Sequence, residues 1–66
     1  MSFQLFDVVV ATESLPEAGI RVGMRGVIVD IYSDGEYEVE FCNNAGETLA
    51  MAAMRRSQLV SAGPSE

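Results

Sequence analysis

Histidine, lysine and tryptophan are absent from this sequence of 66 residues, and cysteine occurs once. Without histidine, neither a Ser-His-Asp triad nor a Cys-His pair can form. The single Cys42 permits neither an internal disulfide nor a multi-cysteine metal site, and it fits a small apolar side chain in a reducing compartment. These absences predict a cytoplasmic protein that is not an enzyme and holds no metal or other cofactor.

Long apolar runs are also missing, since none approaches the roughly 20 residues that a membrane span needs. The N-terminal residues Met1–Gln4 lack the basic region of a signal peptide, so none is expected. Ten acidic residues face four arginines, giving a net charge of −6. Because nucleic acids and anionic membranes are bound largely through lysine and arginine, both are disfavoured as partners, whereas a basic protein is favoured. The alternative is that the acidity only keeps the domain soluble.

The length allows a single domain over residues 1–66, in which only about 60% of the unfolded surface becomes buried. Apolar residues make up 48% of the chain, enough for a core. We expect an ordered core of about residues 4–61 and a frayed C-terminal tail.

Strand periodicity is clearest in Glu36–Phe41, where glutamates alternate with apolar residues. Because side chains alternate along a strand, Tyr37, Val39 and Phe41 are expected to face the core. Further strands are predicted at Phe6–Ala11, Val27–Tyr32, Thr48–Met54 and Leu59–Val60. The Thr48–Met54 segment could instead form a short helix, since alanine and methionine favour helices.

The connections between these strands are also readable. Asp34-Gly35 predicts a tight hairpin, because glycine adopts positive φ without steric cost. Turns are expected at Gly23–Gly26 and Asn43–Gly46, and a 3₁₀ turn at Arg55–Gln58. The Thr12–Ile20 segment reads as an excursion whose apolar anchors, Leu15 and Ile20, return to the core. Together these elements predict an all-β fold, a small five-stranded SH3-like barrel with one short 3₁₀ turn before the last strand.

A family resemblance accompanies this pattern. The stretch Val22–Ile31, with two glycines three positions apart before a β-branched strand, looks like the KOW-type segment of SH3-like barrels. The stretch Phe6–Leu59 resembles a bacterial family of small uncharacterised domains of unknown function with an SH3-like barrel. The resemblance rests on these pieces: Phe6–Val10, Leu15–Glu17, Gly23, Gly26, Tyr37–Phe41, Gly46 and Ser57–Leu59. It implies a fold and a prokaryotic origin, and it carries over no catalytic residues.

The first candidate surface is the stripe of Glu36, Glu38 and Glu40, which could bind a basic protein partner. The alternatives are a solvated strand face and a loose cation site, although alternate strand residues lie about 6.6–6.8 Å apart and calcium sites favour curved loops. Arg55-Arg56 could bind an anion or balance local charge.

The second candidate surface is an apolar excess in two of the strands. Val27, Ile28, Val29 and Ile31 cannot all point inward from a regular strand, so either a bulge resets the alternation or a side chain faces outward. A similar excess comes from Leu49, Met51 and Met54. The candidate partner-binding residues are therefore Ile28, Met51 and Met54, together with the three glutamates.

These observations favour a non-enzymatic protein-interaction module of a prokaryote, which binds a protein partner or itself through the acidic strand face, the apolar surface or both. The alternative function is a KOW-like nucleic-acid-binding module, which the net charge of −6 and the absence of lysine disfavour.

Overall fold

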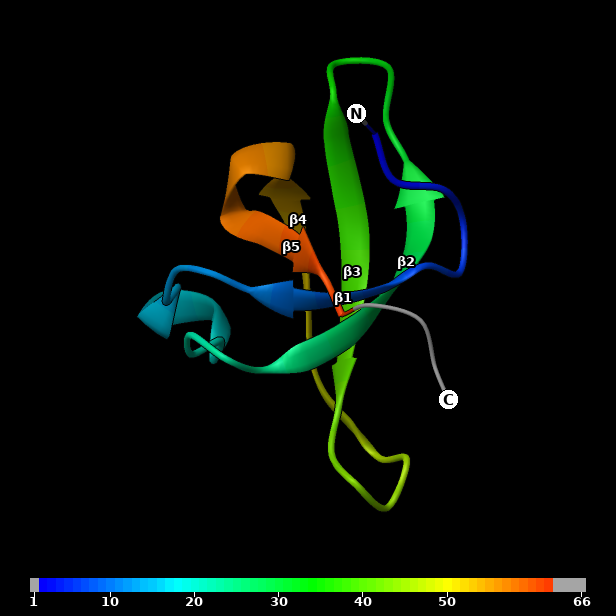
Figure 1. Ribbon diagram of the computed structural model, residues 1–66. Helices are drawn as coiled ribbons and strands as arrows, with labels where there is room; N and C mark the ends of the chain where they lie inside the picture. Colours follow the sequence, from blue (N-terminus) through cyan, green and yellow to red (C-terminus); the bar gives the residue numbers. More distant parts are fainter. Residues whose placement is uncertain (1, 63–66) are drawn as a thin grey trace.

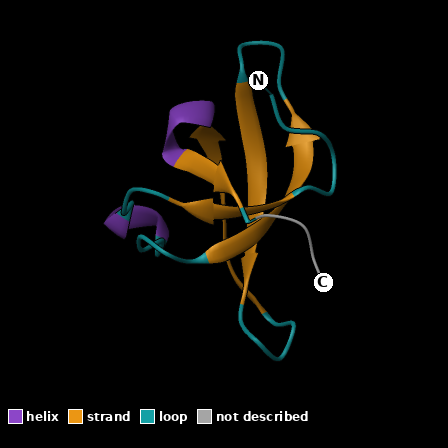
Figure 2. Cartoon of the chain, in the orientation of Figure 1, coloured by secondary structure: helices purple, strands orange, loops and turns teal. Residues whose placement is uncertain are grey.

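The computed structural model describes residues 2–62, so the tail predicted to be frayed lies, from residue 63 onward, outside the described residues. Five antiparallel strands form one curled sheet in the order β4-β3-β2-β1-β5 (Figures 1 and 2). The strands are β1 (Val8–Ala11), β2 (Arg25–Ile31), β3 (Glu36–Cys42), β4 (Thr48–Arg55) and β5 (Leu59–Ser61). Two 3₁₀ turns accompany them, η1 (Pro16–Ala18) and η2 (Arg56–Gln58). The predicted all-β fold is confirmed, including the 3₁₀ turn before the last strand, while β4 and β5 end the sheet without closing it.

The β2–β3 hairpin forms where Asp-Gly predicts it. Gly35 has φ 89°, a conformation that glycine adopts readily, and its N–H donates to the Tyr32 carbonyl at 3.2 Å. Tyr32 in turn donates to the Glu36 carbonyl at 2.8 Å. The hairpin fixes the register of β3, so its glutamates and its apolar residues are placed on opposite faces.

The strand predicted at Thr48–Met54 is confirmed as β4, which extends one residue further to Arg55, and alanine and methionine do not turn it into a helix. It pairs with β3 from Glu36 opposite Arg55 to Phe41 opposite Ala50. Pairing to a neighbouring strand supplies hydrogen bonds and burial that outweigh a helix propensity of a few tenths of a kcal/mol per residue.

A β-bulge in β2 resolves the apolar excess of that strand. The pairing of β2 with β3 shifts register between Ile28 and Asp30, so Val29 is the extra residue. Ile28 then points into the core, Val27 and Val29 are half-buried, and Ile31 at the strand end is exposed. Both explanations offered by the sequence apply, since a bulge is present and one isoleucine faces outward.

The hydrophobic core lies on the concave face of the sheet. The inward-facing residues Tyr37, Val39 and Phe41 of β3 are buried there, as predicted. Among residues 2–62, the largest fully buried side chains are Val9, Ile20, Ile28, Val39, Phe41 and Met54. The proposal that Ile28 and Met54 contribute to a partner-binding surface is therefore wrong for the folded chain, because each has 0% exposure. Ile28 lies opposite Val39 and Met54 opposite Tyr37, so both share the inward face of β3.

The turn predicted at Gly23–Gly26 is shorter than expected. Gly23 has φ 94° and lies in the turn, but β2 begins at Arg25, so Gly26 is a strand residue. Gly26 is buried against β3, where it pairs with Phe41. The absence of a side chain there lets the two strands approach with Phe41 filling the space.

The excursion between β1 and β2 folds back as its anchors predict. Ile20 is fully buried, Leu15 packs against the core, and the two residues form an isolated β-bridge. The segment between them forms η1, a helical turn that the sequence did not predict, which contacts β4. This loop leaves a groove beside β4.

Candidate functional site

The convex face of the sheet carries the acidic residues of β2 and β3. Glu36, Glu38 and Glu40 point away from the core and are half-buried. Asp30 of β2 lies opposite Glu38 and therefore on the same face, because antiparallel partners point to the same side of a sheet. We call Asp30, Glu36, Glu38 and Glu40 the acidic face. The segment 30–40, which also holds Asp34 in the hairpin turn, contains five carboxylates and no basic residue.

Tyr32 joins the acidic face through a hydrogen bond. Its hydroxyl donates to Glu38 Oε1 at 2.8 Å. This bond, followed by slight desolvation and the charges of Glu38, Asp30 and Asp34, raises the pKa of the Tyr32 hydroxyl. The bond holds the Glu38 carboxylate beside an exposed aromatic ring, which offers a cationic side chain both a negative charge and a π face.

Neighbouring residues of β4 order the rest of the acidic face. The Thr48 hydroxyl donates to Glu40 Oε2. Arg55 lies opposite Glu36 at the end of the strand pair, and Met51 lies opposite Glu40. Met51 is 52% exposed, so an apolar side chain stands directly beside the carboxylates. The face can thus contact both the charge and the alkyl stem of a lysine or arginine.

The sequence-predicted site residues separate into two groups in the structure. Glu36, Glu38, Glu40 and Met51 lie together on the convex face, whereas Ile28 and Met54 lie in the core. Sequence reasoning did not assign Asp30 or Tyr32 to the site. The Asp34-Gly35 turn sets how β2 pairs with β3, so it offers a signal that Asp30 lies beside Glu38. The bulge at Val29 shifts this pairing by one residue, and the face of Asp30 is therefore ambiguous from the sequence.

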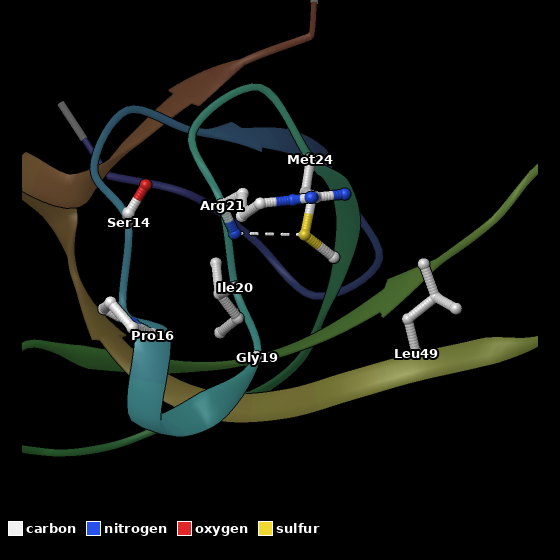
Figure 3. A pocket seen from close by; sticks show the side chains of 7 residues that line it. All are labelled: Ser14, Pro16, Gly19, Ile20, Arg21, Met24 and Leu49. Atoms are coloured by element: carbon white, nitrogen blue, oxygen red, sulfur yellow. Dashed lines mark hydrogen bonds between the residues drawn. The ribbon is translucent and has the colours of Figure 1, made fainter.

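A groove of about 660 Å³ lies between the β1–β2 excursion and the start of β4 (Figure 3). Its lining residues are Ser14, Pro16, Gly19, Ile20, Arg21, Met24 and Leu49. The Arg21 backbone N–H points at the Met24 sulfur, 3.1 Å away, and Leu49 faces them across the groove. The walls are mainly apolar, and the groove is separate from the acidic face.

Within residues 2–62, no group of three or more acidic, cysteine or histidine residues could hold a metal ion. Cys42 is half-buried at the end of β3, with no second cysteine in the sequence. No helix in the described part of the chain is long and apolar enough to cross a membrane.

Residues 5–61 match the model of a protein family described as Domain of unknown function (DUF4926). The chain belongs to this family. The match includes all five strands and both 3₁₀ turns, so the family is defined over the whole fold. The expectation of a small domain of unknown function is confirmed. Neither the curated proteins nor the solved structures contain a significant match.

Proposed function

We propose that this domain is a non-enzymatic protein-interaction module whose acidic face binds a basic segment of a partner protein. The acidic face supports this proposal because Asp30, Glu36, Glu38 and Glu40 lie together on one side of the sheet, with Met51 beside them. Charge complementarity steers a basic partner toward such a surface and raises the association rate.

The acidic face also offers contacts beyond charge. Tyr32 supplies an aromatic ring and Met51 a flexible apolar side chain, both exposed. Tyrosine and methionine are enriched at protein interfaces because they add contact area, whereas exposed charge alone adds little affinity. The four arginines occur in the excursion, at the start of β2 and at the β4–η2 junction, which supports a protein partner over a nucleic acid.

The proposal extends to the wider class of this fold. A meander of five strands, with a long first connection and a 3₁₀ turn before the last strand, supports placement among SH3-like barrels, with β2 as the KOW-like segment. Bacterial origin and a cytoplasmic location belong to the same proposal, since the single cysteine fits a reducing compartment.

A titration with a ten-residue peptide of alternating arginine and serine tests the proposed function. The variant Glu36→Gln/Glu38→Gln/Glu40→Gln keeps side-chain shape and removes three charges from the acidic face. We expect it to raise the peptide Kd at least about tenfold in low salt, measured by fluorescence anisotropy, because the charges that steer and hold the peptide are lost.

The matched control is Glu13→Gln/Glu17→Gln/Glu47→Gln, which changes net charge equally at exposed residues outside the acidic face. We expect it to change the Kd by no more than about twofold, through long-range charge alone. Equal weakening in both variants would mean that the peptide senses only net charge, and the proposed function would be rejected.

A further inference from the structure

Strand β4 forms one edge of the sheet, since it is the terminal strand in the order and, within the described residues 2–62, pairs with β3 alone. Its central residues, Leu49–Met54, include no charge and no proline. Natural proteins usually protect edge strands with charges, prolines or coverage, because an open edge pairs with other strands. Within residues 2–62, the pairing of β4 shifts register at Phe41/Cys42, near Leu49, and η1 also contacts the strand.

Hydrogen bonds at both ends of β3 show which backbone groups of β4 are free. Tyr32 donates to the Glu36 carbonyl across one hairpin, and Asn43 donates to the Glu47 carbonyl across the other. Because backbone groups alternate along a strand, the even-numbered residues of β3 bond to β2 and the odd-numbered ones to β4. The β4 residues opposite Tyr37, Val39 and Phe41 are Met54, Ala52 and Ala50. These three therefore bond inward to β3.

Met51, Ala53 and Arg55 consequently direct their N–H and C=O groups to the open edge. The Arg55 N–H confirms this direction, since it donates to Gln58 Oε1 at 2.8 Å rather than to β3. Within residues 2–62, no hydrogen bond engages the backbone groups of Met51 or Ala53 on this edge. Two consecutive outward-facing residues thus present four backbone groups to a further strand.

We propose that a second copy of this chain covers the edge, with the two β4 strands pairing antiparallel about Ala52. In this register Met51 of each copy lies opposite Ala53 of the other. Each such pair exchanges two hydrogen bonds, so all eight outward groups of the two residues in both copies are satisfied in four bonds. This inference does not depend on the acidic face or on its basic partner.

The charges at the two ends of β4 make the strand complementary to itself. Glu47 precedes the strand and Arg55-Arg56 ends it, and all three are exposed. Antiparallel pairing places Arg55 of one copy opposite Leu49 of the other copy. Glu47 of that other copy is then the diagonal neighbour of Arg55, close enough for the long arginine side chain to reach it. The contact occurs twice by symmetry, whereas parallel pairing would bring like charges together.

The net charge of −6 on each copy opposes this pairing only weakly at physiological salt. The screening length there is about 8 Å, shorter than the 17 Å smallest extent of one molecule, so repulsion between the two bodies is largely screened. Charges in direct contact across the interface are screened much less.

Sedimentation velocity on the full chain in about 150 mM salt tests the dimer. We expect the 7.1 kDa monomer to convert to a species of twice the mass as concentration rises from about 5 to about 500 μM.

Two variants test whether the β4 edge is the interface. Ala53→Pro removes an N–H that the fold itself does not use, and Met51→Lys places a charge on the edge. Each is expected to raise the dimer Kd at least about tenfold, while Val22→Lys, at an exposed apolar residue outside β4, is expected to leave it within about twofold.

Charge exchange tests the antiparallel direction. Glu47→Arg and Arg55→Glu are each expected to weaken the dimer, and the double variant is expected to restore it, because both cross-contacts are re-formed with reversed sign. Circular dichroism verifies that each variant folds. If Ala53→Pro does not fold, the dimer Kd of Met51→Lys alone tests whether the β4 edge is the interface. A monomer at every concentration, a dimer indifferent to Met51→Lys, or a double variant without rescue would each overturn the proposal.

Discussion

Replacing Met54 by alanine is expected to lower the free energy of unfolding by about 2–5 kcal/mol, the range for truncating a buried methionine. Met54 has 0% exposure and lies opposite Tyr37 in the core. The loss includes both the transfer of the side chain and the cavity that remains. A domain of this length has a total stability of about 3–10 kcal/mol, so the variant is expected to lose much of its folded population near 37 °C.

Met51→Ala is the matched control, since it removes the same side chain from the same strand three residues earlier. Met51 is 52% exposed, and we expect a change within about 0.5 kcal/mol. Urea unfolding of both variants at low protein concentration, followed by circular dichroism, measures the contrast. Equal destabilisation by the two substitutions would show that the inward and outward faces of β4 are wrongly assigned.

Replacing Gly26 by alanine is expected to lower the free energy of unfolding by about 2 kcal/mol. A methyl group at this position would lie 2.8 Å from Val39 Cγ1 and 2.9 Å from both the Glu40 carbonyl oxygen and Phe41 Cδ1. The carbonyl belongs to the paired backbone of β3 and cannot move alone, so β2 must shift from β3. Overpacking of this kind costs about 1–3 kcal/mol.

Gly46→Ala separates this effect from the general cost of replacing a glycine. Gly46 has φ 82° but open space around its α-carbon, so alanine there pays only the cost of the left-handed conformation, about 1 kcal/mol. Thermal unfolding of both variants gives the comparison, with about 4–8 °C expected for each kcal/mol. A Gly26→Ala protein as stable as the parent chain would contradict the close approach of β2 and β3.

The local chemistry of single segments determined most of the fold in advance. The alternation in Glu36–Phe41 gave both the strand and its inward face, because strand side chains alternate regardless of context. Asp34-Gly35 gave the hairpin for a similar reason. The predicted ranges of β1 and β2 differ from the observed strands by one or two residues, since pairing with neighbours decides where a strand begins.

The sequence does not determine whether an isolated apolar residue in a strand points toward the core or toward solvent. Ile28 and Met54 were expected at a partner surface because the apolar residues of their strands exceed one face. The bulge at Val29 and the register of β4 put both in the core, and these depend on contacts between strands. The same applies to Tyr32 and Glu38, whose hydrogen bond follows from the position of the hairpin.

The groove beside β4 also lies beyond sequence reasoning. Arg21 and Leu49 are far apart in the chain, and they line the same groove only because the excursion folds back across the sheet. Its anchors Leu15 and Ile20 were recognised as apolar contacts, but η1 and the space that it leaves depend on three-dimensional packing.

The most direct test of the acidic face is a ¹⁵N NMR titration of the full chain with the arginine-serine peptide. We expect the largest amide shift changes in residues 30–40 and at Met51, with smaller changes in the excursion around Arg21. These changes should shrink as salt rises, because charge holds the peptide. Shift changes confined to the groove, or spread evenly over the chain, would contradict the assignment of the acidic face as the binding surface.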